Sequence, residues 1–175
     1  MRISVITVCY NAASTLKDAM DSVLGQVPDA KAPFELEYIV VDGGSTDGTL
    51  DLLAPYRERI ATLISEPDQG LYDAMNKGIK AATGDVVAIL NADDVYASTD
   101  VLAQVARAFT ASGTDAVYGD LNYVAADNLS RVTRRWRSGA YSPGAFRRGW
   151  MPPHPALFVR RACYDRWGLF TLSLR

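Results

Sequence analysis

The stretch Ala88–Tyr96 reads Ala-Ile-Leu-Asn-Ala-Asp-Asp-Val-Tyr, an apolar run that ends in two adjacent carboxylates. Together with Val86 and Val87 before it, the run predicts a central parallel strand that is buried on both faces. Sheets of this kind place ligand-binding groups just beyond the carboxyl ends of their strands. The sequence therefore predicts that Asp93 and Asp94 lie at a ligand-binding edge.

Two neighbouring carboxylates at such an edge favour a divalent cation. They repel each other and raise each other's pKa unless a cation lies between them, and Mg²⁺ and Mn²⁺ take oxygen ligands of this kind. The simpler interpretation is that Asp93 and Asp94 only cap the next helix, which starts near Ser98–Asp100, because Asp is common at helix N-termini. This stretch alone leaves both interpretations open.

Strands and helices alternate along the rest of the chain. Short apolar runs predict strands, and apolar residues at helical spacing predict helices between them. Residues 121–124 and 129–136 predict an antiparallel hairpin. The pattern predicts an α/β fold whose mostly parallel sheet is flanked by helices. The predicted strands of that sheet fall at residues 3–8, 35–41, 60–65, 86–90, 116–120 and 156–159.

The composition is that of one ordinary domain. The 175 residues are 49% hydrophobic, which is enough for a real core. No segment approaches the ~20 apolar residues of a membrane span. No basic-then-apolar leader precedes the first strand, so a cytoplasmic location is the expectation. Cys9 and Cys163 are too few for a disulfide framework, and their spacing matches no zinc pattern.

Charge is distributed unevenly along the chain. Residues 131–175 hold ten Arg and one acid, a net charge of +9, so the net charge of −2 for the whole chain leaves −11 for residues 1–130. A basic segment beside an acidic, cation-binding cleft suits a phosphate-bearing ligand or an anionic membrane, so peripheral contact with the inner face of the membrane is an expectation. Nucleic acid is not an expected partner, because the segment carries no motif for it.

Polar groups follow two further strands. Asp42 ends the second strand and precedes two glycines, where it could accept a hydrogen bond from a nucleobase N–H or a ribose hydroxyl. In the helix that follows residue 70, Tyr72 could stack, Asn76 could hydrogen-bond and Lys77 could neutralise a phosphate. The alternative for these three residues is an ordinary solvated helix face.

Two more candidates lie in the second half of the chain. Asp120 ends a strand at what should be the same edge of the sheet. His154 is the only histidine, and prolines on both sides fix its backbone, although a lone His is more often structural.

Four linked motifs resemble those of the family 2 glycosyltransferases of GT-A fold. In the family's order they are Val5–Asn11, Val40–Gly48, Glu66–Gly78 and Leu90–Asp94, and Val117–Asp120 and His154–Ala156 also match. The resemblance implies a single GT-A (Rossmann-like) domain over 1–175. Its residues 1–96 would bind a nucleotide-sugar, and its residues 97–175, with the hairpin, would form an acceptor-side half that is incomplete at the C-terminus.

The resemblance also implies a role for each candidate residue. Asp94 would bind a divalent metal, Mn²⁺ or Mg²⁺, with Asp93 and His154 as further contacts. A metal of this kind neutralises the charge of the leaving diphosphate as a Lewis acid. The residues implied to hold the nucleotide-diphospho-sugar are Thr7, Tyr10, Asn11, Asp42, Gly44, Asp68, Tyr72, Asn76, Lys77, Asn91 and Asp93.

The family inverts configuration at the anomeric carbon. An acceptor hydroxyl attacks opposite the diphosphate, and a carboxylate takes its proton as general base. The resemblance places that base a few residues beyond the segment Phe170–Arg175, so donor binding with weak or absent transfer is expected if residue 175 is the true end. Asp120 would contact the transferred sugar or the acceptor and is not assigned as the base.

The sequence thus predicts an inverting, metal-dependent glycosyltransferase. It would move a sugar from a UDP- or GDP-linked donor to a saccharide or lipid-linked acceptor, in polysaccharide or glycolipid assembly. A non-catalytic nucleotide-binding scaffold or partner subunit is the alternative, because the C-terminal acid is missing. A nucleotidyltransferase is less favoured, because the loop Tyr10–Ala13 lacks the Gly-rich, Arg-containing phosphate loop of such enzymes.

Overall fold

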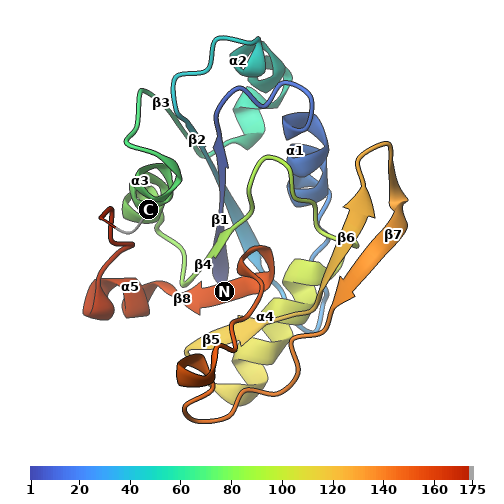
Figure 1. Ribbon diagram of the computed structural model, residues 1–175, viewed down its shortest axis with the longest axis vertical. Coiled ribbons are helices and arrows are strands. Elements are labelled where there is room, and N and C mark those ends of the chain that lie inside the picture. The colour runs from blue at the N-terminus through green and yellow to red at the C-terminus, as the bar shows by residue number, and fades with distance from the viewer. Residues whose placement is uncertain (174–175) are drawn as a thin grey trace.

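A six-stranded sheet organises the computed structural model, which describes residues 1–173. Its strands are β1 (Arg2–Cys9), β2 (Glu35–Asp42), β3 (Thr62–Ser65), β4 (Val86–Ile89), β5 (Ala116–Tyr118) and β8 (Leu157–Arg160). They lie in the order β3-β2-β1-β4-β8-β5 (Figure 1). The first four strands pair in parallel, and β8 runs antiparallel to both β4 and β5. The predicted α/β class with a mostly parallel sheet is confirmed.

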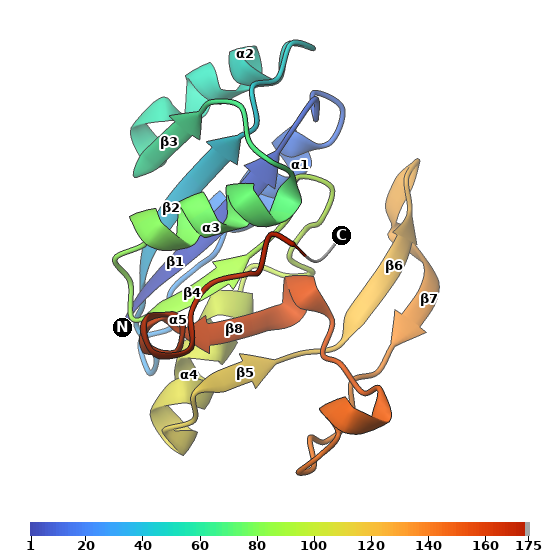
Figure 2. The same cartoon turned by 60° about the vertical axis from the view of Figure 1, so that its left-hand side comes forward.

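Helices cover both faces of this sheet. They are α1 (Leu16–Leu24), α2 (Thr49–Leu53), α3 (Leu71–Ala81), α4 (Val101–Ser112) and α5 (Arg161–Trp167), and a 3₁₀ turn, η1 (Ala54–Arg59), follows α2. One hydrophobic core packs α1 and α4 against one face, and a second packs α3 and part of α5 against the other. Figure 2 shows α3 lying across the face opposite α1 and α4.

The alternation of side chains along β1 supplies both cores. Ile3 and Val5 point into the core that contains Met20, whereas Ile6 and Val8 point into the core that contains Met75. All of β1 from Ile3 to Cys9 is buried, as expected of a strand at the centre of a parallel sheet. Because β2 and β4 both pair in parallel with β1, their carboxyl ends lie at the same edge of the sheet as that of β1.

The carboxyl ends of β1, β2 and β4 are tied to one another beyond their regular pairing. Leu90 N–H donates to Ile6 O (2.9 Å), and Ala92 N–H donates to Val8 O (3.2 Å), so the chain after β4 stays beside β1. Gly43 N–H donates to Cys9 O (2.9 Å), which holds the end of β2 at the same level. The predicted ligand-binding edge is therefore one continuous rim.

The remaining strands form a hairpin apart from the main sheet. β6 (Leu121–Ala125) and β7 (Asn128–Trp136) pair only with each other and project away from the helices (Figure 2). The chain then returns through two 3₁₀ turns, η2 (Phe146–Arg148) and η3 (His154–Ala156), to β8. Of the basic segment 131–175, Arg175 lies outside the described residues. The helices within residues 1–173 are all too short or too polar to cross a bilayer.

Candidate functional site

A cavity of about 510 Å³ opens at the rim formed by β1, β2 and β4. The residues that line it come from the end of β1 and the loop after it, the loop that enters α3 with the start of that helix, and the loop after β4. Five of the residues predicted to bind a ligand line it: Tyr10, Asn11, Asp68, Asn91 and Asp93. The other lining residues are Val8, Cys9, Ala12, Ser14, Thr15, Gly70, Leu71, Ala74 and Ala92.

The loop after β1 is held in an unusual conformation that exposes Tyr10. Asn11 has a φ of +48°, a left-handed value that Asn adopts more readily than most residues. Its backbone N–H donates to Ser45 Oγ (2.8 Å), and its side-chain oxygen accepts from Thr46 N–H (2.9 Å). Tyr10 is 65% exposed and lines the cavity, so its ring is a ready surface for a flat ligand to stack upon.

Asp42, at the end of β2, stabilises the turn that follows this strand. Its carboxylate is fully buried and accepts hydrogen bonds from Gly44 N–H (3.2 Å), Ser65 Oγ (2.8 Å) and both Ser45 N–H and Ser45 Oγ. Burial and the charge of Asp42 raise the pKa of the Cys9 thiol to about 12, so Cys9 is an inert, neutral side chain. Asp42 thus fixes the turn after β2 and does not line the cavity.

Thr7 lies within the core and away from the cavity. Its side chain is fully buried in β1, where its hydroxyl accepts a hydrogen bond from Tyr38 Oη (3.0 Å). The motif that carries Thr7 therefore reaches the cavity through Tyr10 and Asn11.

Asp68 is brought into the cavity by two glycines. Its Oδ1 accepts from Gly70 N–H (2.7 Å), in a turn that opens α3. A Cβ at Gly43 would clash with Asp68 Oδ2, so a larger residue there would force the Asp68 side chain to move. Gly44 has a φ of +86° and turns the chain beside Pro67. Both the Asp68 carboxylate and the Tyr10 ring lie beside Gly43, and both line the cavity.

Two adjacent aspartates follow β4, and Asp93 is exposed whereas Asp94 is half-buried. Burial and the charge of Asp93 raise the pKa of Asp94 to about 6. The helix α4 begins only at Val101, with Asp100 before it, so neither aspartate caps that helix. Asn91 Oδ1 is buried and accepts no hydrogen bond from the residues that the structure describes. Two carboxylates beside an unpartnered amide oxygen fit an oxygen-ligated Mg²⁺ or Mn²⁺.

His154 does not complete a three-ligand cluster with these aspartates. Within residues 1–173, no three His, Cys, Asp or Glu side chains come together in a metal-binding group. The imidazole of His154 instead stacks on Phe170, with ring centroids 5.9 Å apart, and burial lowers its pKa. A Mg²⁺-type site needs only one or two carboxylates when substrate phosphates supply further ligands.

Phe170 also binds the face of α3 that carries Tyr72 and Asn76. Tyr72 also stacks on Phe170, with ring centroids 5.4 Å apart. The Asn76 side-chain amide donates to Phe170 O (2.9 Å) and accepts from Phe170 N–H (2.9 Å). Asn76 is only 5% exposed, so this helix face is not simply solvated. Lys77 donates to Pro67 O (2.9 Å) and pairs with Glu66 (2.9 Å). None of Tyr72, Asn76 and Lys77 lines the cavity.

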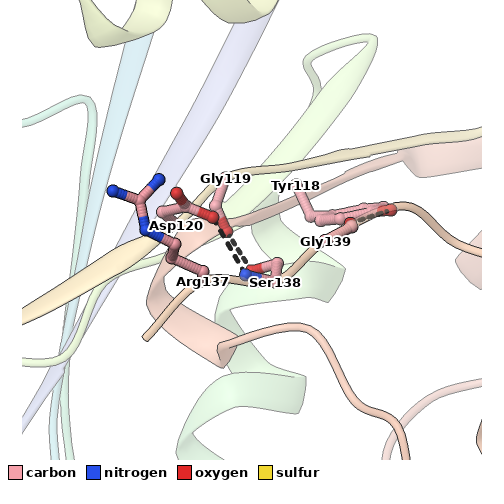
Figure 3. Close-up of a pocket in the computed structure, with 6 residues that line it drawn as sticks. All are labelled: Tyr118, Gly119, Asp120, Arg137, Ser138 and Gly139. Atoms are coloured by element: carbon pink, nitrogen blue, oxygen red, sulfur yellow. Dashed lines mark hydrogen bonds between the residues drawn. The ribbon is translucent and has the colours of Figure 1, made fainter. Parts of the chain in front are cut away.

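Asp120 lines a second, smaller pocket of about 320 Å³ (Figure 3). The pocket lies where β5 passes into β6 and where the chain leaves β7. Asp120 Oδ1 accepts from Ser138 N–H (2.9 Å), and Ser138 Oγ donates to Gly119 O (2.6 Å). Because β5 runs parallel to β4, Asp120 lies at the same edge of the sheet as Asp93 and Asp94.

A family model described as glycosyl transferase family 2 matches residues 4–163, which is most of the chain. The chain belongs to this family.

Curated family 2 relatives are longer than this chain. A PGL/p-HBAD biosynthesis glycosyltransferase of Mycobacterium tuberculosis H37Rv is 36% identical over 180 residues, which cover 98% of this chain and 64% of the relative. An uncharacterized glycosyltransferase of Nostoc sp. is 41% identical over 99 residues, 55% of this chain and 29% of the relative. The chain thus spans less than two thirds of the length of these relatives.

Solved structures show the same fold. S. aureus TarS 1–349 in complex with UDP-GlcNAc superposes with a TM-score of 0.74 at 21% identity, over 98% of this chain and 49% of TarS 1–349. The mannosyltransferase PcManGT of Pyrobaculum calidifontis, in complex with GDP-Man and Mn²⁺, also gives a TM-score of 0.74, at 24% identity, over 98% of this chain and 48% of PcManGT. The GT-A fold expected of a family 2 member is confirmed.

Several pocket residues of this family 2 chain were not singled out from its sequence. Ser14, Thr15 and Leu71 line the larger cavity because they follow the motif residues Asn11 and Gly70. Arg137 and Ser138 line the smaller pocket, and the signal for them was only their place in a basic segment.

Proposed function

We propose that this chain binds a nucleotide-diphospho-sugar together with a divalent cation and forms the donor-binding part of an inverting glycosyltransferase. The observation that carries the proposal is the cavity lined by Tyr10, Asn11, Asp68, Asn91 and Asp93. Asp94 follows Asp93 directly in the chain and does not itself line the cavity. The pKa of Asp94 is raised first by burial and then by the charge of Asp93, and a cation at this edge would offset both effects.

The five predicted residues that line the cavity each have a role in this proposal. Tyr10 stacks on the nucleobase, and Asn11 and Asp68 bind polar groups of the nucleoside. Asn91 and Asp93 face the ribose and the diphosphate. Asp42, Thr7 and Gly44 act through the backbone that they fix, since their side chains do not line the cavity.

The cation is Mn²⁺ or Mg²⁺ in this proposal, held by Asp94 with Asp93. PcManGT, which has the same fold, is complexed with GDP-Man and Mn²⁺. When bound, such a cation supplies charge neutralisation for a diphosphate leaving group. His154, whose pKa burial lowers, is a further contact in this proposal. Tyr72 and Asn76 hold Phe170, which stacks on His154, and Lys77 holds the loop that enters α3.

The reaction follows from inversion at the anomeric carbon. An acceptor hydroxyl oxygen forms a bond to that carbon while the bond to the diphosphate oxygen breaks, and the hydroxyl proton passes to a carboxylate. The base implied by the family resemblance falls after residue 175 and so outside the described residues. In this division of work residues 1–96 bind the donor and residues 97–175 face the acceptor, with Asp120 contacting the acceptor or the transferred sugar.

The setting we infer is glycolipid or polysaccharide assembly at a membrane surface. The mycobacterial relatives are named for PGL/p-HBAD biosynthesis. Arg134 and Arg135 lie on the exposed hairpin, and neither is ion-paired within the described part of the chain. A polybasic surface gains about 1 kcal/mol per Arg near anionic lipid. Replacing both with Gln should weaken sedimentation with phosphatidylserine vesicles, and unchanged sedimentation would contradict membrane contact.

Product analysis tests the reaction class. The protein is incubated with UDP-GlcNAc or GDP-Man in Mn²⁺ or in a chelator, and release of UDP or GDP is measured. We expect slow, metal-dependent release with one donor, and faster release from a protein extended past residue 175 with the corresponding segment of a longer family 2 relative. A parallel reaction of a sugar 1-phosphate with UTP or GTP measures pyrophosphate. Pyrophosphate release would identify a nucleotidyltransferase, and binding without any turnover in either protein would identify a scaffold.

A further inference from the structure

Three consecutive backbone N–H groups in the loop after β1 are occupied by side chains of the segment 45–49, which joins β2 to α2. The donors are the N–H groups of residues 11–13. Their acceptors, in the same order, are Ser45 Oγ (2.8 Å), Thr49 Oγ1 (2.8 Å) and Asp47 Oδ2 (3.0 Å). Figure 1 shows the two segments next to each other, beyond the ends of β1 and β2. We call Ser45, Asp47 and Thr49 the capping residues.

The capping residues are themselves held in place. The Ser45 hydroxyl donates to the buried carboxylate of Asp42. The Thr49 hydroxyl donates to Asp47 Oδ1, which also accepts from Thr49 N–H (3.0 Å). Hydrogen bonds from the Thr49 hydroxyl and from Ala13 N–H lower the pKa of Asp47, so its carboxylate stays charged at neutral pH. Each capping side chain thus has a second partner that fixes the direction of its oxygen.

Capped N–H groups are not available to a ligand. Loops that join a strand to a helix commonly bind phosphate through a run of free backbone N–H groups. Here residues 11–13 already donate to side-chain oxygens, and one of the acceptors, Asp47, is an anion that repels phosphate. The loop after β1 is therefore closed to the diphosphate of a nucleotide, and the edge at Asn91–Asp94 is left for it.

The capped loop also sets the orientation of Tyr10. Gly43 N–H donates to Cys9 O (2.9 Å) on one side of this residue, and Asn11 N–H donates to Ser45 Oγ on the other. At Asn11 the chain turns through a left-handed φ of +48°. The Tyr10 side chain is 65% exposed, so packing does little to orient it. The direction of its ring in the cavity therefore depends on the capped backbone that follows it.

We propose that Ser45, Asp47 and Thr49 are positioning residues for nucleoside binding: they keep phosphate off the loop after β1 and hold the Tyr10 ring where a nucleobase stacks on it. None of the three lines the cavity, so they act only through the backbone that they cap. The inference rests on the proposed function, because it presupposes a nucleoside beside Tyr10. It gives Asp47 and Thr49 a role in donor binding, although neither touches the donor.

Two variants each remove one cap. Thr49→Val replaces the acceptor of Ala12 N–H by a methyl group of similar size. Asp47→Ala removes the acceptor of Ala13 N–H at an exposed position, and so decides the question even if Thr49→Val does not fold. Thr49→Ser restores the hydroxyl. Thr46→Val is the matched control, because Thr46 lies exposed among the capping residues and its side chain makes no hydrogen bond within residues 1–173.

Calorimetry measures the affinity of each protein for UDP, GDP and pyrophosphate, all with Mn²⁺. Because pyrophosphate has no nucleobase, it reports the cation edge without Tyr10. We expect the nucleotide that native protein binds to bind at least about tenfold more weakly to Thr49→Val and Asp47→Ala, and with native affinity to Thr49→Ser and Thr46→Val. Pyrophosphate affinity should fall in none of these variants, which separates a misplaced Tyr10 from a general loss of structure.

Nucleotide affinity that is equal in native protein, Thr49→Val and Asp47→Ala would overturn the inference, as would a joint fall in nucleotide and pyrophosphate affinity. Shifts of the ¹⁵N amide signals of residues 11–13 in native protein, on adding pyrophosphate without metal, would also overturn it, because these N–H groups would then be open to phosphate. Native protein that binds neither UDP nor GDP would remove the proposed function itself.

Discussion

The central strand β1 and the hairpin strand β7 bury their side chains in opposite ways. In β1 every residue from Ile3 to Cys9 is buried, whereas in β7 every residue from Asn128 to Arg135 is exposed. The first half holds its ligand-facing groups through backbone fixed by a two-sided core. The hairpin of β6 and β7 presents side chains from a ribbon whose two strands pair only with each other. We infer that donor recognition belongs to the rigid half and that the ribbon is free to vary with the acceptor or the membrane.

The largest difference should appear when one leucine is truncated in each half. Leu16 in α1 is fully buried, and Leu129 in β7 is 46% exposed. Leu16→Ala should cost about 2–5 kcal/mol of unfolding free energy, because it leaves a cavity in the core. Leu129→Ala should change it by less than about 0.5 kcal/mol. Urea denaturation of both variants measures this, and similar losses would show that the hairpin is packed as part of the core.

A second difference concerns two aspartates, Asp94 after β4 and Asp127 in the hairpin turn, and their effect on stability in the absence of metal. The pKa of Asp94 is raised from 3.8 to about 6, so the folded protein holds that proton more tightly than the unfolded chain does. Stability therefore falls as pH rises between these two values and stays reduced above them. Above about pH 6, Asp94→Asn should therefore raise the unfolding free energy by up to about 3 kcal/mol, because one pKa unit corresponds to about 1.4 kcal/mol.

Thermal unfolding in a chelator tests this at two pH values. The gain from Asp94→Asn should be present at about pH 8 and absent at about pH 3, where the carboxyl is protonated in both states. Asp127→Asn, on the exposed turn of the hairpin, should change little at either pH. A gain that persists at low pH would mean that charge is not its cause.

A third, smaller difference concerns two asparagines. Asn76 is buried and makes both of its hydrogen bonds to Phe170, whereas Asn122 lies exposed on β6. Asn76→Ala should cost about 2 kcal/mol by leaving backbone groups of Phe170 unpaired. It should also speed tryptic cleavage after Arg166, while Asn122→Ala should do neither. Equal cleavage rates in the two variants would show that the Asn76 contact does not hold the C-terminal segment.

The sequence predicted what depends on local pattern. The apolar run that ends at Leu90 located the central strand, and the aspartates after it located the rim, because strand ends in a parallel sheet share an edge. It did not predict that Asn76 meets Phe170, since these residues are 94 positions apart. The placement of Arg137 beside Asp120 was hidden for the same reason, because the hairpin brings the two together.

Thr7 shows a different limit of sequence reasoning. Side chains alternate along a strand, so a shift of one residue moves a group from one face of the sheet to the other. The strand motif identified the correct rim, but only the structure shows that Thr7 points toward Tyr38 in the core while Tyr10 points toward the cavity.

The most direct test of the account is calorimetric titration of UDP and of GDP, each with and without Mn²⁺, into the native chain, Asp94→Asn and Asp127→Asn. The account predicts that one nucleotide binds in a metal-dependent way, that Asp94→Asn weakens this binding at least about tenfold, and that Asp127→Asn preserves it. Binding that is equal with and without Mn²⁺, or equal in native protein and Asp94→Asn, would contradict a metal-bridged donor site. Failure of both nucleotides to bind native, folded protein would contradict donor binding altogether.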